Sequence, residues 1–124
     1  MENCVFCNAF EKERIIYKDK FWTGVYDSFP VSEGHVLLIP NRHCETYFDL
    51  NKEELEVLPD VIERVKSLLD INYSPTGYNI GANCGKSAGQ TVMHCHIHII
   101  PRYDGDVEDP RGGVRGVIPD KQKY

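Results

Sequence analysis

Three histidines stand at every second position near the C-terminal end of the chain, and this spacing limits what the segment can fold into. His94, His96 and His98 alternate with apolar side chains over residues 91–100. A period of two predicts a β-strand, in which successive side chains point to opposite faces. Two residues advance about 6.6 Å along a strand, so we expect the three imidazoles to share one face while the apolar residues enter a core.

A row of histidines has two functional interpretations. Imidazole is nucleophilic and largely neutral near pH 7, and a purely structural face has no need of three titrating groups side by side. In the first interpretation, His94, His96 or His98 holds a catalytic zinc ion with an open position for water. In the second, the middle imidazole is a covalent nucleophile, and its neighbours fix its tautomer and bind phosphate oxygens.

A glycine-bearing loop leads into the histidine row. Glycine lets backbone N–H groups approach an anion closely, and Gly89 stands near the end of this loop. Asn83, Gln90 and Thr91 add neutral hydrogen-bond partners. Such a loop is weak evidence alone, but joined directly to the histidines it predicts a phosphate-binding site.

The pattern His-φ-His-φ-His-φ-φ at residues 94–100, where φ is apolar, resembles the signature of the histidine triad (HIT) nucleotide hydrolases and transferases. Further landmarks in the family's order are Asp27 and residues 34–40, 83–85 and 89–91. The resemblance covers nearly the whole chain. Cys95 is a mild departure, because valine is commoner there, but its apolar side chain should not disturb the strand.

The resemblance implies an α+β fold, in which a five-stranded antiparallel sheet packs on one main helix with a short N-terminal helix. It also implies a homodimer in which two protomers form one continuous sheet. We expect one domain over residues 1–124, with a core at 1–101 and a tail at 102–124. Tails in this family help to set substrate choice, so Arg111 or Arg115 could reach a polyphosphate, unless the tail is disordered.

The resemblance also assigns roles to individual residues. It makes His96 the nucleophile, places His98 on the phosphate oxygens, lets His94 orient the array and gives His35 a supporting role. The predicted substrate-binding residues are Val25, Tyr26, Asp27, Asn83, Gly89, Gln90, Thr91 and His98. Among them, Asp27 would bind the ribose hydroxyls, while Val25, Tyr26 and the neighbouring Ser28 would line the base.

A second cluster of candidate ligands begins near the N-terminus. Cys4 and Cys7 form a Cys-x-x-Cys pair, and no thioredoxin-like βαβ pattern surrounds it, so a redox role is disfavoured. A zinc site would need two more ligands, and His43 and His94 are candidates. Many bacterial HIT and Hint-like proteins carry this pair, which supports a structural zinc ion at these four residues. We expect no organic cofactor.

These features together predict a nucleotide hydrolase that acts at the α-phosphate of a dinucleoside polyphosphate through a covalent phosphohistidine intermediate. The first alternative is an adenosine 5′-phosphoramidate hydrolase, which would use the same residues. The second is a nucleotide-binding adaptor without catalysis. Gln90 and the arginines of the tail favour the polyphosphate.

Composition limits the partners that the protein is expected to bind and predicts its cellular compartment. The net charge of −5 repels polyanions, so we expect no general nucleic-acid binding. Five cysteines, without a signal-like N-terminus or a membrane-length apolar run, predict a cytoplasmic protein with neither disulfides nor membrane contact.

Local periodicity predicts the remaining elements. Strands are expected over residues 14–19, 21–27, 35–39 and 78–81. A helix should begin after Asn51, capped together with Glu54, and be kinked by Pro59. The predicted buried stripe of this helix consists of Leu55, Leu58, Ile62, Val65 and Leu69, and Glu54 is expected on the solvated side.

Overall fold

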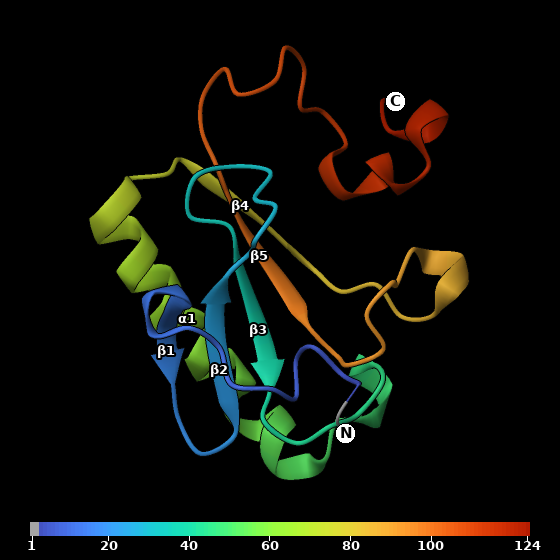
Figure 1. The fold of residues 1–124 in the computed structure, drawn as a ribbon. Coiled ribbons are helices and arrows are strands. Elements are labelled where there is room, and N and C mark those ends of the chain that lie inside the picture. Colours follow the sequence, from blue (N-terminus) through green and yellow to red (C-terminus); the bar gives the residue numbers. More distant parts are fainter. Residues whose placement is uncertain (1–2) are drawn as a thin grey trace.

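One antiparallel sheet and one long helix form the body of the molecule in a computed structural model, which describes residues 3–124 (Figure 1). The five strands are β1 (Ile15–Lys18), β2 (Trp22–Tyr26), β3 (Val36–Pro40), β4 (Gly77–Gly81) and β5 (Ile97–Arg102). Their order in the sheet is β1-β2-β3-β5-β4, and every neighbouring pair is antiparallel. The predicted α+β architecture is therefore confirmed.

The histidine strand is shorter than the sequence pattern predicts. β5 begins at Ile97, and residues 92–96 approach it without strand pairing. One reason is that the side chain of His94 lies in a separate cluster, with Nε2 2.9 Å from the carbonyl oxygen of Pro40. The amide of Cys95 instead donates to the carbonyl of Cys44 at 2.7 Å. Only His98 of the three histidines stands within the strand proper.

The long helix α1 (Lys52–Tyr73) begins as predicted. Asn51 Oδ1 accepts from the amide of Glu54, and Glu54 Oε1 accepts from the amide of Asn51, which completes a capping box. The helix is continuous through Pro59. Asn51 thus sets the start of the helix that covers the sheet.

The predicted buried stripe of α1 is partly wrong. The residues of α1 that are buried are Glu54, Leu58, Val61, Val65 and Leu69. The carboxylate of Glu54 is 2 % exposed because it pairs with Arg42 at 2.9 Å, and its carbonyl accepts from the indole of Trp22. Leu55 instead lies 37 % exposed. The stripe is therefore rotated toward the face that carries Glu54.

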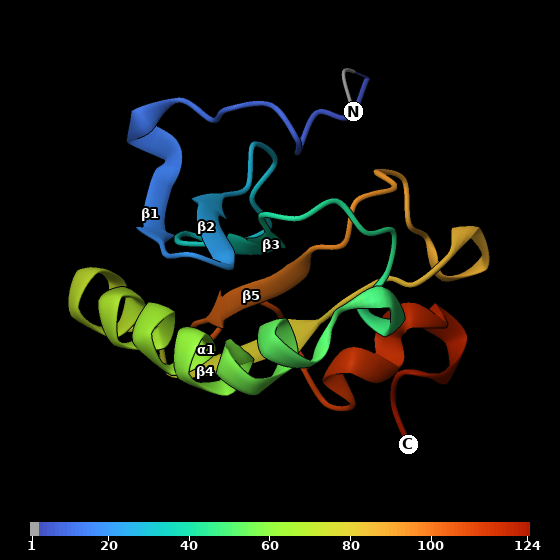
Figure 2. The same cartoon turned by 90° about the horizontal axis from the view of Figure 1, so that it is seen from below.

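The sheet lies between two layers, and the view from below shows both of them (Figure 2). On one face, α1 packs on a core that includes Leu38, Ile97 and Ile99. On the opposite face, the N-terminal segment crosses the sheet, and a small core of Val25, Leu37 and Ile39 receives its apolar side chains. The short N-terminal helix expected from the resemblance is a single 3-10 turn, η1 (Lys12–Arg14).

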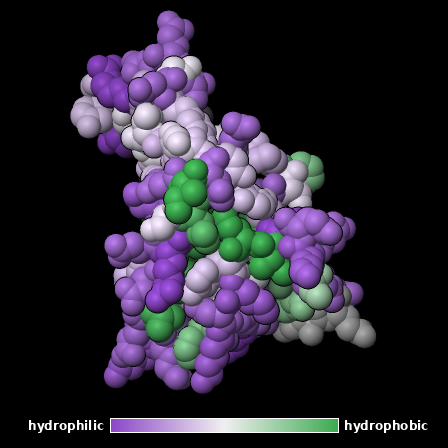
Figure 3. All heavy atoms as spheres, turned by 90° about the vertical axis from the view of Figure 1, so that its left-hand side faces the viewer, coloured by the Kyte–Doolittle hydropathy of each residue, from purple (hydrophilic) through white to green (hydrophobic). Residues whose placement is uncertain are grey.

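The C-terminal tail folds into the short turns η4 (Gly113–Val117) and η5 (Pro119–Lys121), beside β4 in Figure 1. Figure 3 views the side of the molecule where β1 and α1 lie, and it shows a narrow hydrophobic band among hydrophilic side chains. The described residues include no helix that is both long and apolar enough to traverse a bilayer.

Candidate active site and metal centre

A cavity of about 880 Å³ opens on the face of the sheet opposite α1. This volume suits a small-molecule ligand of nucleotide size. Strand ends, the glycine-bearing loop and the N-terminal segment all contribute to its wall. The lining residues that the sequence predicted as functional are Asp27, Ser28, His35, Asn83, Gly89, Thr91, His96 and His98. The structure thus brings together most of the predicted substrate site.

The main chain fixes the tautomer of His96. Its Nδ1 lies 2.8 Å from the carbonyl oxygen of His94, and a carbonyl can only accept, so Nδ1 carries the proton. In the neutral ring, the other nitrogen, Nε2, therefore holds a free lone pair. Since His96 lines the cavity, this arrangement suits nucleophilic attack on a bound electrophile.

Hydrogen bonds also define the tautomers of His35 and His98. The amide of Val31 donates to Nδ1 of His35 at 3.2 Å, so the proton of this ring lies on Nε2. His35 Nε2 then donates to Nδ1 of His98 at 2.9 Å. His98 is left with a proton on Nε2, which makes it a neutral hydrogen-bond donor next to His96, 5.3 Å away between ring centroids.

The environment keeps these rings uncharged. Burial, together with His96 and His35, lowers the pKa of His98 to about 4, although the nearby carboxylate of Asp27 acts in the opposite direction. Burial also lowers the pKa of His35, against the same carboxylate. At neutral pH, His98 therefore donates a proton in a hydrogen bond without carrying a positive charge.

Asp27 stands at the end of β2, where its carboxylate closes a turn and faces the cavity. Oδ1 accepts from the amide of Phe29 at 2.8 Å, and Oδ2 lies 3.4 Å from Nε2 of His35. One carboxylate oxygen is therefore held by the turn while the other stays near the histidines. This geometry leaves the carboxylate able to accept hydrogen bonds from ligand hydroxyls.

The glycine-bearing loop contributes backbone and small polar groups. Gly89 adopts φ +92°, a left-handed conformation that favours glycine, and both Asn83 and Thr91 line the cavity beside it. Gln90, which was predicted to bind phosphate oxygens, is 4 % exposed and does not line the cavity. The Gln90 side chain accepts from the amide of Gly85 and donates to the carbonyls of Glu45 and Val92.

The position of β2 also corrects the predicted base pocket. Tyr26 faces α1, where its ring packs edge-on against Tyr73 at 6.4 Å, so it does not line the cavity. Val25 faces the cavity side but is fully covered by the N-terminal segment. The alternation along the strand made it impossible for both to share one pocket. Ser28 does line the cavity.

Residues of the N-terminal segment, which were not predicted to belong to the site, form the opposite wall. Phe6, Phe10 and Arg14 line the cavity, and the two phenylalanine rings lie 6.0 Å apart. The guanidinium of Arg14 lies 5.2 Å from the Phe10 ring and donates to the carbonyl of Tyr26. The apolar pair Val5-Phe6 between the two cysteines was the only signal that this segment packs on the sheet.

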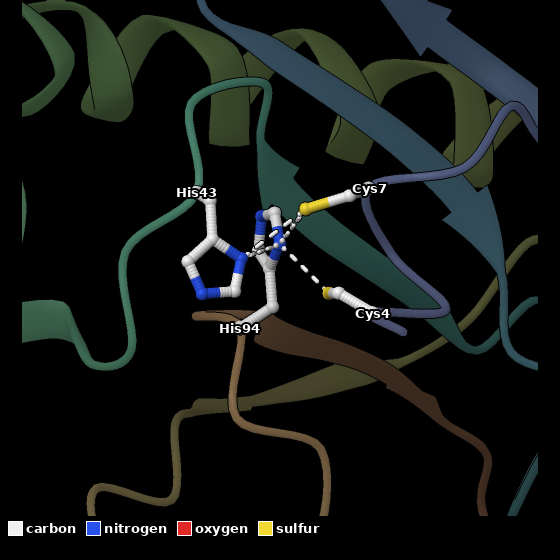
Figure 4. Close-up of side chains that lie close together, drawn as sticks. All are labelled: Cys4, Cys7, His43 and His94. Carbon is white, nitrogen blue, oxygen red and sulfur yellow. Dashed lines mark hydrogen bonds between the residues drawn. The ribbon is translucent and has the colours of Figure 1, made fainter. Parts of the chain in front are cut away.

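The four predicted zinc ligands converge at one edge of this face, as Figure 4 shows. Nδ1 of His94 lies 3.4 Å from the sulfur of Cys4, 3.4 Å from that of Cys7 and 3.1 Å from Nδ1 of His43. Cys7 Sγ lies 3.2 Å from the same nitrogen of His43. All four donor atoms lie within 4.8 Å of one another.

The donor set fits a tetrahedral zinc ion in both chemistry and spacing. Zinc–sulfur and zinc–nitrogen bond lengths place neighbouring donors about 3.3–3.8 Å apart. Nε2 of His94 donates to the carbonyl of Pro40 at 2.9 Å, so the Nδ1 lone pair is directed to the cluster. With two thiolates and two imidazoles, the ligand set would be complete without water, as in structural zinc sites.

The histidine row does not offer a comparable ligand set for a catalytic zinc ion. Within residues 3–124, the second group of adjacent ligand atoms comprises Asp27, His35 and His98. A hydrogen bond already joins the two histidines, and Asp27 Oδ2 lies 3.4 Å from Nε2 of His35. His94 belongs to the cysteine cluster instead, so the three histidines of the row do not form a common ligand set.

The two arginines proposed for phosphate binding lie away from the cavity. Arg115 donates to the carbonyls of Lys121 and Gln122 and lies over the ring of Tyr124, which keeps its guanidinium within the tail. Arg111 is exposed, and neither arginine lines the cavity.

Comparison with known proteins identifies the family of this chain. Residues 9–105 match the model of the HIT domain. An uncharacterized HIT-like protein of Methanocaldococcus jannaschii, MJ0866, is 37% identical over 123 residues, covering 95% of this chain and 94% of its own. An asymmetrical bis(5′-nucleosyl)-tetraphosphatase of Schizosaccharomyces pombe is 35% identical over 96 residues, or 77% of this chain and 53% of its own.

Solved structures give the same result. A zinc-bound histidine triad family protein from Mycobacterium smegmatis superposes with a TM-score of 0.76 at 33% identity, covering 87% of this chain and 81% of that protein. The matched domain model spans more than half of the chain, and both the fold and the histidine pattern agree with it. The chain is therefore a member of the HIT family.

Proposed function

We propose that this protein hydrolyses a nucleoside phosphate bond at the α-phosphorus, with His96 as a covalent nucleophile. The observation that carries the proposal is the hydrogen bond from His96 Nδ1 to the His94 carbonyl, which leaves Nε2 with a free lone pair in a cavity of nucleotide size. The family includes nucleotide hydrolases, and the S. pombe relative is named as one.

The reaction has two displacement steps. In the first, His96 Nε2 forms a bond to the α-phosphorus, the bond from phosphorus to the leaving group breaks, and the leaving group takes the electron pair. His98 donates its Nε2 proton in a hydrogen bond to a phosphate oxygen, while Asn83, Thr91 and the amides of the loop stabilise the developing charge. In the second, water attacks phosphorus, the electron pair returns to His96 Nε2, and a proton passes to solvent.

The first candidate substrate is a dinucleoside polyphosphate. Its leaving group is a nucleoside polyphosphate, which departs as a stable anion and needs no proton donor. The name of the S. pombe relative supports this choice. Gln90 and the tail arginines favoured a polyphosphate on sequence grounds, but the structure adds no support. The side chains of Gln90 and Arg115 donate to backbone carbonyls, and Arg111 does not line the cavity.

One observation favours an adenosine 5′-phosphoramidate as a second candidate. Arg14 is the only lysine or arginine among the described residues that line the cavity, and its guanidinium is partly used by the Tyr26 carbonyl. A long polyphosphate would find few cations there, whereas a phosphoramidate carries only one phosphate. Its amine leaving group needs a proton, and neutral His98, whose ring centroid lies 5.3 Å from that of His96, is a donor beside it.

We also propose that Cys4, Cys7, His43 and His94 bind a structural zinc ion. The spacing of the donors supports this site, as does the zinc-bound relative from M. smegmatis. Bound there, zinc would supply a rigid cross-link between the N-terminal segment and the start of the histidine row.

The homodimer with a continuous sheet remains a proposal. β4 is an outer strand, and its Ile80 side chain is 46% exposed. Pairing of β4 with a second copy would cover this edge. Light scattering after size-exclusion chromatography measures the mass: twice 14.2 kDa supports the dimer, and a single-chain mass excludes it.

Parallel rate measurements test the function and separate the two substrates. The kcat/KM values for diadenosine tetraphosphate and an adenosine 5′-phosphoramidate are compared, and the higher value identifies the preferred substrate. Both rates should vanish in the His96→Ala variant. If the protein binds the nucleotide but turns over neither substrate, it is a nucleotide-binding adaptor and not a hydrolase.

A further inference from the structure

One short segment belongs to both the cysteine cluster and the cavity. Cys4 and Cys7 supply two of the four ligand atoms, while Val5 and Phe6, which stand between them in the sequence, line the cavity. The segment turns tightly, with the amide of Cys7 donating to the carbonyl of Cys4. The two cysteines therefore point toward one site while the residues between them reach the other.

Phe6 bridges the two sites through its ring. Its centroid lies 5.1 Å from that of His96 at an interplanar angle of 83°, and 6.1 Å from that of His94 at 73°. Both are edge-to-face arrangements, which hold aromatic rings in a defined orientation. Phe6 thus contacts the proposed nucleophile and a proposed metal ligand at once.

Little else fastens this segment to the sheet. Within the described residues 3–9, the polar contacts with the rest of the chain are those of the two cysteines with His43 and His94. The remaining hydrogen bonds, from Asn8 and from the amide of Cys7, end within the segment itself. Apolar packing of Phe6 on the small core supplies the other attachment. Binding of a metal ion by these four ligands would therefore determine how firmly Phe6 is held against the sheet.

We propose that metal binding at the cysteine cluster and nucleotide binding in the cavity are thermodynamically coupled, and that Phe6 transmits the coupling. This inference rests on the proposed nucleotide and zinc sites. A metal ion orders residues 4–7, which sets Phe6 as a rigid wall beside His96, and a nucleotide that contacts this wall then binds more tightly. Linkage requires the nucleotide to strengthen metal binding by the same factor.

The test measures both halves of the linkage in the full-length chain. Adenosine 5′-monophosphate, a product-like ligand, is titrated calorimetrically into zinc-loaded protein and into protein stripped with a chelator. Zinc affinity is measured by chelator competition with and without the same nucleotide. We expect zinc to lower the Kd of the nucleotide about tenfold, and the nucleotide to lower the Kd of zinc by the same factor.

Two variants assign the coupling to Phe6. Phe6→Ala keeps all four ligands, so it should bind one zinc ion, yet its coupling factor should fall below about twofold. Phe48→Ala serves as the matched control, because Phe48 is 80% exposed and lies outside the cavity, and it should couple like the unmodified chain. Undiminished coupling in Phe6→Ala would overturn the role of Phe6.

A kinetic measurement keeps the test valid if the stripped protein unfolds. Zinc release from loaded protein into excess chelator needs no folded metal-free state. Because most changes in affinity appear in the dissociation rate, the nucleotide should slow release about tenfold in the unmodified chain but not in Phe6→Ala. Equal release rates with and without bound nucleotide would overturn the coupling while leaving the proposed function intact. Failure of the zinc-loaded protein to bind the nucleotide at all would overturn both.

Discussion

Nε2 of His35 lies 2.9 Å from Nδ1 of His98, and the amide of Val31 lies 3.2 Å from the other nitrogen of His35. The amide of Val31 can only donate, so it fixes the proton of His35 on Nε2. That proton is donated to His98, which fixes the proton of His98 on its own Nε2. His35 is therefore a positioning residue in the proposed mechanism. It presents His98 to the phosphate as a neutral donor.

The lowered pKa of His98 predicts how stability depends on pH. Burial and the neighbouring histidines lower this pKa from 6.5 to about 4, so the unfolded chain binds a proton between these values that the folded chain does not. The free energy of unfolding should thus rise as pH increases through this window, by up to about 3 kcal/mol, and level off above it. Urea denaturation at pH 5 and pH 7 measures the difference.

The control for this pH effect is His98→Asn, which removes the titrating group. His35 and His94, whose pKa values burial also lowers, act in the same direction, so the difference between the two proteins isolates His98. The variant should lose part of the stability gained between pH 5 and pH 7. An unchanged gain would exclude a depressed pKa at His98.

The position of Asp27 at the cavity predicts that the protein prefers ribonucleotide substrates to 2′-deoxyribonucleotide substrates. If its carboxylate accepts hydrogen bonds from the ribose hydroxyls, removal of one hydroxyl should lower kcat/KM about tenfold. Asp27→Ala should act on ribonucleotide and 2′-deoxyribonucleotide substrates with equal efficiency. Asp27→Asn, which keeps an oxygen for the amide of Phe29, controls for loss of the turn. Equal rates on both sugars in the unmodified protein would exclude this role.

Gln90 should affect stability more than substrate binding. Its buried amide joins three backbone groups, and Gln90→Ala leaves them without partners, so the free energy of unfolding should fall by about 1–3 kcal/mol. Thr91→Ala, at an exposed neighbouring position, should change it by less than about 0.5 kcal/mol. A stable Gln90→Ala variant with a raised KM would instead restore Gln90 as a phosphate ligand.

The buried carboxylate of Glu54 should be a large contributor to stability. Glu54→Ala removes one hydrogen bond of the capping box and the partner of Arg42, so we expect a loss of about 3 kcal/mol in denaturant unfolding. Glu53, the exposed residue before it in the same helical turn, is the matched control, and its replacement by alanine should have little effect. Similar losses for both variants would contradict the structure around Glu54.

Local patterns in the sequence were sufficient for most of the fold. The alternation around His98, the capping signals at Asn51 and the apolar run before Pro40 each depend on neighbours within a few residues, and each produced its element. The position of Glu54 was not predictable in this way, because a glutamate in a first helical turn is usually solvated. Only Arg42 and Trp22, which come from other elements, make its burial favourable.

Long-range packing explains the errors at the site. The wall formed by Phe6 depends on a segment that crosses the sheet and has no periodicity of its own. Tyr26 and Val25 were both assigned to the base pocket, although consecutive residues of a strand point to opposite faces. Gln90 could donate to phosphate or to backbone in chemical terms, and only the tertiary position of Glu45 and Val92 decides between them.

The central claim is that Nε2 of His96 becomes bonded to phosphorus during turnover. Replacement of His96 by alanine should lower kcat at least about 10³-fold while nucleotide affinity is kept. The most direct measurement is an acid quench within one turnover, using a substrate radiolabelled at the α-phosphorus, followed by peptide mapping. The account predicts label on His96 in the unmodified protein and none in His96→Ala. Turnover with no labelled protein, together with an active His96→Ala variant, would contradict it.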